Sequence, residues 1–351
     1  MSAEPTPPFP TPVSDEIPSL AARWNDELAA AVRTLDDLLA RLGLSHSNFG
    51  DIGLPVLADP QFPLFVPQAF LDRMEPGNPR DPLLLQVLPL RSELHEVPGF
   101  VLDPLGEEAA RAVPGLLHKY NGRVLMISAR SCAVNCRYCF RRNYPYQQEP
   151  SRLADWQPAL DYIRADNSIH EVILSGGDPL MLTDGRLCEL HDLLADIPHL
   201  KRLRIHSRLP IVIPSRVNEV LLALLSNSRF SVVMVVHANH PREIAGDCAA
   251  ALGQLKDAGM IVLNQSVLLR GVNDDADVLT ELCQRLVDTG VLPYYLHQLD
   301  RVTGVSHFEV PETRGRELIE TLRTRLPGYA VPRYVQERAG EQSKTVIEFL
   351  D

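Results

Sequence analysis

Short β-rich runs and amphipathic stretches alternate along roughly the last two thirds of the chain. The β-rich runs span residues 123–129, 171–175, 202–206, 231–237, 261–268 and 294–297. Between them, residues 185–195, 217–226, 244–258 and 277–288 carry apolar side chains at helical spacing. This alternation predicts a parallel sheet with helices on its outside. Six strands are too few for a closed eight-stranded barrel, so we expect a partial barrel or an open sheet.

The first third of the chain has a different pattern. Residues 1–19 are rich in proline and predict a flexible tail. Residues 20–43 alternate apolar and charged positions at helical period up to Gly43, which predicts one helix. Residues 51–112 are punctuated by proline and predict short helices and loops. We therefore divide the chain into a tail (1–19), an N-terminal helical region (20–112), a barrel (113–344) and a C-terminal tail (345–351).

Composition excludes several classes of protein. The 351 residues are 45% hydrophobic and 23% charged, which suits a globular protein with a sizeable core. The net charge of −11 disfavours a nucleic-acid-binding role, although residues 199–208 are locally basic. We expect the basic run to lie partly on a solvated strand edge. No apolar run approaches membrane-spanning length, and the N-terminus lacks a signal peptide's basic start and apolar core. We expect a cytoplasmic protein without a membrane partner.

Three cysteines carry the strongest chemical pattern. Cys132, Cys136 and Cys139 form C-x3-C-x2-C, with Tyr138 before the third. This spacing fits the paired zinc patterns poorly. Iron–sulfur clusters of the [4Fe–4S] type are normally held by four thiolates, so three would leave one iron free to bind another molecule. The alternative is three incidental cysteines in a loop. The other cysteines lie singly in helix-like stretches and are expected to be buried thiols.

Polar residues also gather where the predicted strands end. Gly176, Gly177 and Asp178 follow the second run, Ser207 the third and His237 the fourth, while Gln265 lies within the fifth. Asp300 comes just beyond the sixth run. The carboxyl ends of parallel strands lie at one edge of a sheet, so we expect a site there. Two glycines would let the backbone approach a ligand closely, although Gly-Gly-Asp-Pro is also an ordinary turn.

The cysteine motif resembles that of the radical S-adenosylmethionine superfamily. The resemblance implies a (β/α)6 TIM-like partial barrel of the radical SAM type, with S-adenosylmethionine bound to the free iron and cleaved to a 5′-deoxyadenosyl radical. It places Tyr138 against this cofactor and its amino group at Gly176, Gly177 and Asp178. From residue 51 to 344 the chain more specifically resembles the lysine 2,3-aminomutases, through V-P-G-L-L-H-K-Y, L-S-G-G-D-P-L, S-R-L-P-I-V, H-A-N-H-P, P-Y-Y-L-H-Q-L-D and A-V-P-R-Y-V.

This second resemblance implies further roles. Lys344 would bind pyridoxal 5′-phosphate as a Schiff base, and Lys119, Tyr120 and Arg123 would contact its phosphate. Ser207, His237 and Gln265 would contact S-adenosylmethionine or the pyridoxal ring. Arg141 would hold the substrate carboxylate, and Asp300 and Glu337 its distal ammonium. The alternatives are a hairpin turn at 119–123, a surface arginine, a surface lysine at 344, a structural His237, and ion pairs of the two acids with Arg301 or Arg338.

The implied reaction converts free L-α-lysine to β-lysine with electrons from a flavodoxin-like reductant. Glu337 stands where the catabolic enzymes carry aspartate, Asp275 where they offer a zinc ligand, and the sequence stops soon after Lys344. These departures resemble the short branch that makes (R)-β-lysine for an elongation factor P β-lysine ligase, without a structural zinc. An aminomutase for arginine, ornithine or glutamate, and a non-catalytic iron–sulfur electron carrier, remain as alternatives.

Overall fold

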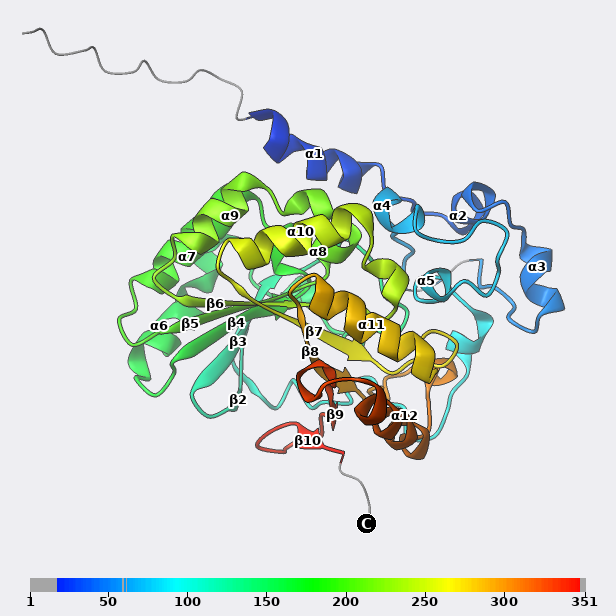
Figure 1. The fold of residues 1–351 in the computed structure, drawn as a ribbon. Coiled ribbons are helices and arrows are strands. Elements are labelled where there is room, and N and C mark those ends of the chain that lie inside the picture. Colours follow the sequence, from blue (N-terminus) through cyan, green and yellow to red (C-terminus); the bar gives the residue numbers. More distant parts are fainter. Residues whose placement is uncertain (1–17, 59, 61, 348–351) are drawn as a thin grey trace, which may run out of the picture.

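A computed structural model describes residues 18–58, 60 and 62–347, and its centre is a ten-stranded sheet with the strands in chain order (Figure 1). The strands are β1 (Arg111–Val113), β2 (Leu116–Tyr120), β3 (Arg123–Ala129), β4 (Glu171–Gly176), β5 (Arg202–Ser207), β6 (Ser231–Val236), β7 (Ile261–Val267), β8 (Leu292–His297), β9 (Arg333–Gln336) and β10 (Thr345–Val346). Strands β3 to β9 are parallel, and antiparallel hairpins flank them at both ends.

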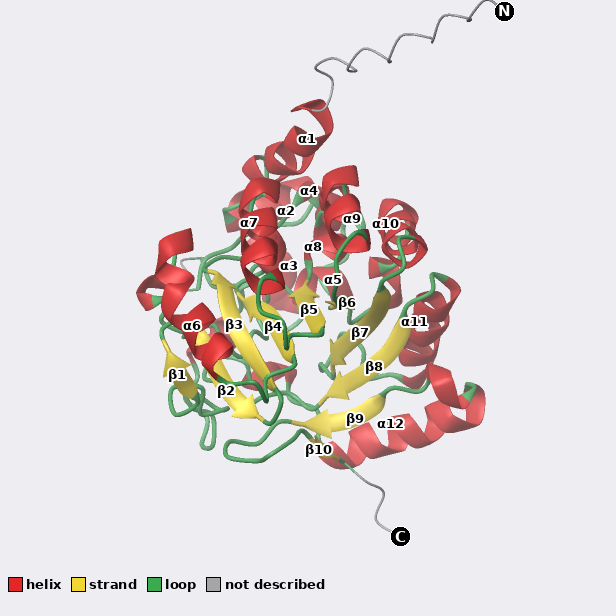
Figure 2. Ribbon diagram, turned by 90° about the vertical axis from the view of Figure 1, so that its left-hand side faces the viewer, coloured by secondary structure: helices red, strands yellow, loops and turns green. Residues whose placement is uncertain are grey.

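Helices surround the curved sheet on its outer side (Figure 2). The α-helices are α1 (Pro18–Ala29), α2 (Leu35–Arg41), α3 (His46–Asp51), α4 (Gln68–Leu71), α5 (Pro82–Leu85), α6 (Gln157–Ala165), α7 (Asp184–Ala195), α8 (Leu209–Val212), α9 (Glu219–Ser226), α10 (Gly246–Asp257), α11 (Ala276–Asp288) and α12 (Glu312–Arg325). Short 3-10 helices are η1 (Arg91–Leu94), η2 (Tyr146–Gln148), η3 (Leu153–Trp156), η4 (Pro179–Met181), η5 (Pro214–Arg216), η6 (Pro241–Glu243), η7 (Ser306–Phe308) and η8 (Gly328–Ala330).

The predicted partial barrel is confirmed, with one strand more than expected. All six predicted strands are present within two residues of their expected bounds, and the chain order of the strands leaves β1 and β10 as the two ends of the sheet. Strand β9 adds a seventh parallel strand beside β8. Its four residues, R-Y-V-Q, are too few to give a pattern, and pairing with β8 creates the strand. Among the described residues, no helix combines the length and the apolarity that a bilayer crossing requires.

The single helix predicted over residues 20–43 is wrong. The segment is split into α1 and α2, because Val32 leaves the helical path to pair with Val66 in an isolated bridge. The Val32 amide donates to the Val66 carbonyl oxygen over 2.8 Å. Thr34 then starts α2, since its side chain accepts a hydrogen bond from the Asp37 amide. Tertiary pairing and a capping residue therefore override the helical period.

The two predicted tails have different outcomes. Residues 1–17 lie outside the described residues, as do 348–351. Thr345 and Val346, assigned to the C-terminal tail, form β10 instead. They pair with Gln336 and Val335 of β9, so the end of the described chain is part of the sheet.

The N-terminal region lies against the loop that follows β3. The Phe65 carbonyl accepts from the Asn135 amide over 3.2 Å, and the Gln86 carbonyl accepts from the Arg137 amide over 2.8 Å. Gln86 is fully buried. These bonds hold the cysteine-bearing loop at the carboxyl ends of the strands, where a site was expected.

Candidate active site

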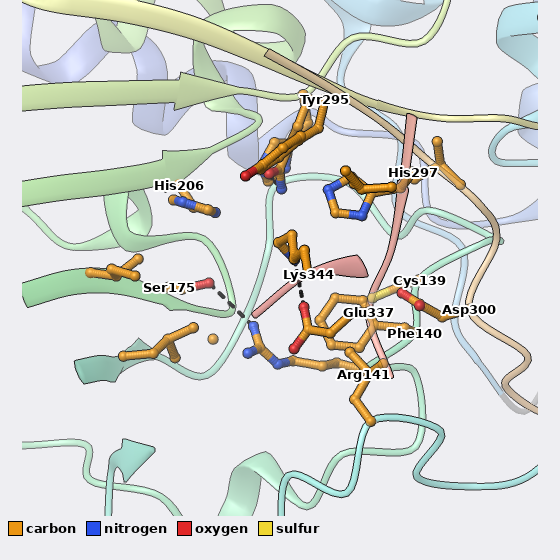
Figure 3. Close-up of a pocket in the computed structure, with 18 of the residues that line it drawn as sticks. Cys139, Phe140, Arg141, Ser175, His206, Tyr295, His297, Asp300, Glu337 and Lys344 are labelled. Carbon is orange, nitrogen blue, oxygen red and sulfur yellow. Dashed lines mark hydrogen bonds and ion pairs between the residues drawn. The ribbon is translucent and has the colours of Figure 1, made fainter. Parts of the chain in front are cut away.

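A cavity of about 630 Å³ lies inside the barrel that the curved sheet forms (Figure 3). Its wall contains sixteen of the seventeen residues predicted from the sequence to form the site. They come from the β2–β3 hairpin, the cysteine loop, the ends of the parallel strands and the β9–β10 hairpin. Ser207 is the exception: it is 1% exposed and lies behind the cavity wall.

Cys132, Cys136 and Cys139 line one part of this cavity. Burial and the charge of Cys136 raise the pKa of Cys139 to about 11, and the charges of Arg141 and Arg142 oppose this shift. Arg208 places a positive charge beside another of the three cysteines, since its Nη1 lies 2.6 Å from the Cys136 Sγ. The C-x3-C-x2-C spacing of the triplet fits a multi-iron cluster, whose irons take one thiolate each, better than the paired ligands of a zinc site.

A buried carboxylate fixes the cysteine loop from the N-terminal region. Glu93 accepts from Arg137 Nε over 2.9 Å and from Arg142 Nη2 over 2.6 Å. Arg142 also donates to the Gly304 carbonyl over 2.9 Å. The two arginines flank Cys139 in the sequence, so Glu93 constrains the loop on both sides of that cysteine.

Gly176 and Gly177 allow close packing against the cysteine loop. A Cβ on Gly177 would lie 2.4 Å from the Ser131 carbonyl oxygen, and Gly176 has a φ of +102°. The Gly176 carbonyl accepts from the Tyr146 hydroxyl over 2.6 Å. The glycines were expected to let the backbone approach a ligand, but here the close neighbour is another segment of this chain.

The carboxylate of Asp178 is occupied by hydrogen bonds within the protein. It accepts from the Ser207 hydroxyl and the Arg208 amide, each over 2.7 Å, and from the amides of Leu180 and Leu209. Burial still raises the pKa of Asp178 to about 6. Asp178 therefore joins the turn after β4 to the turn after β5, and Ser207 contacts this acid rather than the cavity.

Polar side chains form a connected network beside Tyr138. The Tyr138 hydroxyl accepts from Asn239 Nδ2 over 2.7 Å, and the Gln86 side-chain oxygen accepts from Asn239 over 3.0 Å and from Arg208 over 2.7 Å. Glu243 accepts from Arg208 over 3.1 Å. Arg208, Asn239, Gln86 and Glu243 are all buried. The network orients Arg208 towards Cys136 and holds Tyr138 against the same wall.

The β9–β10 hairpin places Lys344 in the cavity. Thr345 pairs with Gln336, so Lys344 and Glu337 are the next residues on the two strands. The Lys344 Nζ donates to the Glu337 Oε2 over 2.5 Å, as Figure 3 shows. The other oxygen, Oε1, accepts from the Lys119 Nζ over 3.1 Å. Burial alone would raise the pKa of Glu337, but the charges of Lys344 and Lys119 lower it to about 2.

Arg141 is a buried residue, not a surface arginine. Its Nε and Nη2 donate to the two oxygens of Glu107 over 2.8 and 2.7 Å, and its Nη1 donates to the Ser175 hydroxyl over 3.2 Å. These bonds use three of the five N–H groups of the guanidinium. One hydrogen on each terminal nitrogen remains for a further acceptor.

Asp300 has no hydrogen-bonding or ion-pairing partner for its carboxylate in the described part of the chain. The neighbouring Arg301 forms an ion pair with Glu309 over 2.6 Å, and Arg338 donates a hydrogen bond to Gln336. Neither arginine forms the ion pair with Asp300 or Glu337 that was the alternative. Burial and the charge of Glu337 raise the pKa of Asp300 to about 7. A nearby positive charge would favour the ionised form of such a buried carboxyl group.

Three histidines line the same cavity in neutral form. His237 lies directly after β6 and its Nε2 is 3.0 Å from the Gln265 amide nitrogen. Burial and the charges of Arg208 and Arg141 lower the pKa of His237 to about 3. His206 and His297 have buried Nε2 atoms without hydrogen-bond partners, and burial holds their pKa values well below the usual range. The two free nitrogens can bind a ligand without adding charge.

The 119–123 segment forms the hairpin turn that sequence reasoning gave as an alternative, and it lines the cavity as well. Tyr120 pairs with Arg123 across the turn, with Gly122 at a φ of +74°. The Arg123 guanidinium lies 4.6 Å from the centre of the Tyr120 ring. The hairpin turn is therefore confirmed, and the contact of these residues with a phosphate group stays a prediction.

Sequence reasoning did not assign several residues of the cavity wall. They are Glu107, Arg204, His206, Arg208, Asn239, Tyr295, His297 and Arg333. Arg208 and Asn239 lie beside motifs already noted, so their place after a strand could have indicated them. Glu107 lies in the proline-punctuated region and gives no local signal, because only tertiary packing brings it to Arg141.

Comparison with known proteins identifies the family of the chain. The family model of the Radical SAM superfamily matches residues 126–283. The L-lysine 2,3-aminomutase of Haemophilus influenzae is 48% identical over 323 residues, which cover 92% of this chain and 95% of that protein. The protein of the same name from Escherichia coli is 47% identical and covers 93% of this chain and 94% of its own length.

More distant relatives include the L-lysine 2,3-aminomutase of Clostridium subterminale, which is 36% identical over 93% of this chain and 78% of that protein. A solved radical SAM methyltransferase from Sphaerobacter thermophilus aligns with a TM-score of 0.44 and 19% identity over 63% of this chain and 68% of that one. On the curated relatives, the chain belongs to the L-lysine 2,3-aminomutase family within the radical SAM superfamily.

Proposed function

We propose that this protein converts free L-α-lysine to β-lysine with pyridoxal 5′-phosphate bound at Lys344. The family consists of isomerases whose cofactors are a [4Fe–4S] cluster, S-adenosylmethionine and pyridoxal phosphate. The observation that carries the proposal is one cavity that contains the three cysteines, Lys344, Arg141 and an unpaired Asp300. Such a cavity can bring a radical source, an amine-binding cofactor and a charged amino acid together.

The cysteines would hold the cluster, which supplies the electron that cleaves S-adenosylmethionine. In this chain Arg208 balances thiolate charge, and Tyr138, Gly176, Gly177 and Asp178 shape the wall beside the cluster loop. Gln265, His237, Tyr120 and Arg123 are proposed contacts of the other cofactors, while Ser207 would act through Asp178. The neutral imidazole of His237 suits contact with a cofactor because it can form a hydrogen bond without bringing a charge that would bind water.

Recognition of the amino acid rests on its two ends. The two remaining N–H groups of Arg141 can bind a carboxylate, held in direction by Glu107. Asp300 can bind the distal ammonium, and this favours lysine over glutamate or leucine, whose side chains offer no cation. Arginine and ornithine carry a distal cation as well, and a substrate assay separates them from lysine.

The finer assignment is the (R)-β-lysine branch that serves an elongation factor P β-lysine ligase, with a flavodoxin-like electron donor. It is supported by Glu337, by Asp275 at the position of a zinc ligand, and by relatives that match over nearly their whole length. Asp275 caps α11 by accepting from the Asp277 and Val278 amides, so its side chain has a structural task here. A cytoplasmic location goes with this assignment.

The test is an anaerobic assay of iron-reconstituted protein with pyridoxal phosphate, S-adenosylmethionine, a strong reductant and L-lysine. Chiral derivatisation and mass spectrometry should detect (R)-β-lysine. Lys344→Ala should keep its iron and lose the product, whereas Cys136→Ala should lose both. Cleavage of S-adenosylmethionine without β-lysine would move the assignment to another amino acid. No cleavage by protein with a verified cluster would favour the electron-carrier alternative.

A further inference from the structure

The basic run noted in the sequence contributes a row of side chains to the inside of the barrel. Arg202, Arg204 and His206 alternate along β5, and Arg208 follows at the same spacing, so they share one face of the strand. Three of the four line the cavity, and the Arg202 side chain is 44% exposed. Arg208 lies beside Cys136. The row therefore runs from the cysteines to the surface at the end of the barrel where the parallel strands begin.

Two further arginines reach the cavity at this end. Arg123 is the first residue of β3 and Arg333 the first residue of β9, and both line the cavity. Strands β3 to β9 are parallel, so they begin at the same end of the barrel. Burial and the hydrogen bond of Tyr294 raise the pKa of Tyr295 to about 12, and the charges of Arg333 and Arg204 oppose this shift. Both guanidinium groups therefore lie near the same side chain.

This end of the cavity is open to solvent. Ile261 and Leu292 are the first residues of β7 and β8, and they share strand faces with Gln265 and Tyr294, which line the cavity. Ile261 and Leu292 are 49% and 46% exposed, and Arg333 is exposed as well. Side chains on the inner face stay exposed where no described segment covers the barrel. We name this place the amino-end opening.

The lining of the amino-end opening carries more positive than negative charge. Arg204 donates to one oxygen of Glu171 through Nε over 2.7 Å and through Nη2, and Arg202 donates to the other oxygen over 3.2 Å. One carboxylate thus serves two arginines. Arg123 and Arg333 form no hydrogen bond or ion pair with a described side chain. The acids of the described cavity wall lie after the ends of strands or in the N-terminal region (Glu107, Asp178, Asp300 and Glu337).

The three small molecules of the proposed function differ in charge. L-lysine carries two ammonium groups and one carboxylate, and S-adenosylmethionine carries an ammonium, a sulfonium and a carboxylate, so both are net cations. Pyridoxal phosphate has a phosphate monoester, with a charge of about −1.5 to −2 at neutral pH. An opening lined by arginines attracts the anion and repels the two cations.

We propose that pyridoxal phosphate enters the cavity through the amino-end opening and that Arg333 and Arg204 steer its phosphate group. The inference rests on the proposed function, since it takes pyridoxal phosphate as the cofactor at Lys344. Tyr120 and Arg123, the predicted phosphate contacts, pair at the start of β3 and line the cavity at this end. Steering by a charge at the rim acts on the rate of association more than on the bound complex.

The experiment follows the association of pyridoxal phosphate with the full-length, cofactor-free protein by stopped-flow absorbance, without S-adenosylmethionine or reductant. Borohydride trapping and mass spectrometry verify attachment at Lys344. At low ionic strength, Arg333→Gln should slow association about 3-fold and Arg333→Glu about 10-fold, while dissociation stays within about 2-fold of wild type. At about 1 M salt the Debye length is about 3 Å, so the differences should disappear. Arg333→Lys keeps the charge and should associate at the wild-type rate.

Two controls isolate the charge and the phosphate. Arg270→Gln removes an exposed arginine that follows β7, at the opposite end of the barrel, and should change the association rate less than about 1.5-fold. Pyridoxal lacks the phosphate group, so wild type and all variants should take it up at the same rate.

Several results would overturn the inference. Association of Arg333→Gln at the wild-type rate at low salt would place the entrance elsewhere. Faster dissociation with unchanged association would make Arg333 a contact of the bound phosphate and not part of an entrance. Equal slowing for pyridoxal would show that the phosphate is not what the arginines attract. If the wild-type protein attaches no pyridoxal phosphate at Lys344, the proposed function itself fails, and that result differs from attachment at an unaltered rate.

Discussion

Glu93→Gln should destabilise the protein and release iron, although Glu93 does not line the cavity. The substitution removes a carboxylate that is 2% exposed and leaves the guanidinium groups of Arg137 and Arg142, at 0% and 8% exposure, without a counterion. Breaking a buried ion pair by removing one partner costs about 3–5 kcal/mol. Both arginines belong to the loop that carries Cys136 and Cys139, so we expect the substitution to destabilise the part of the protein that would hold the cluster.

The loss of stability can be converted into a shift in melting temperature. With an unfolding entropy of about 2.1 cal/mol/K per residue, a chain of this length should melt about 4–7 °C lower. The assay is anaerobic thermal unfolding of the reconstituted protein, with iron content measured in the same sample. Glu281→Gln removes an exposed helical pair with Arg285 and should change the melting temperature by less than about 1 °C.

The effect should also depend on pH. Burial would raise the pKa of Glu93, but the hydrogen bond and charge of Arg137, with the charge of Arg142, hold it below its usual value. The advantage of wild type over Glu93→Gln should therefore be complete above about pH 5 and shrink as the pH falls through the folded pKa. Equal melting temperatures and iron contents at neutral pH would refute the reasoning.

Three more predictions follow from the site. Gly177→Ala should lose iron, since its Cβ would meet the Ser131 backbone at 2.4 Å, whereas Gly185→Ala, with open space around it, should keep it. Arg208→Gln should shift the reduction potential of the cluster to a more negative value, by on the order of 50 mV, because a positive charge 2.6 Å from Cys136 favours the reduced cluster. An anaerobic redox titration followed by electron paramagnetic resonance measures this shift. Lysine binding should weaken as the pH falls below about 7, where Asp300 takes up a proton, and binding of norleucine should not; calorimetry at several pH values measures both.

The sequence predicted the architecture because most of the parallel strands of the barrel have a recognisable pattern in their own residues. Each is a short apolar run, and the helices between them carry their own period, so β3 to β8 were found within two residues of their bounds. Strand β9 and the split between α1 and α2 were missed. Both depend on pairing with distant residues, β9 with β8 and Val32 with Val66.

The sequence by itself also determined the chemistry, because Cys132, Cys136 and Cys139 lie within eight residues and their spacing is a local property. Only the tertiary structure decided which charges pair. Glu337 meets Lys119 across 218 residues, Arg141 meets Glu107, and Asp300 is left without a partner. The interaction of two charges depends on their distance in space and on their burial, and neither quantity can be obtained from the positions of the residues along the chain.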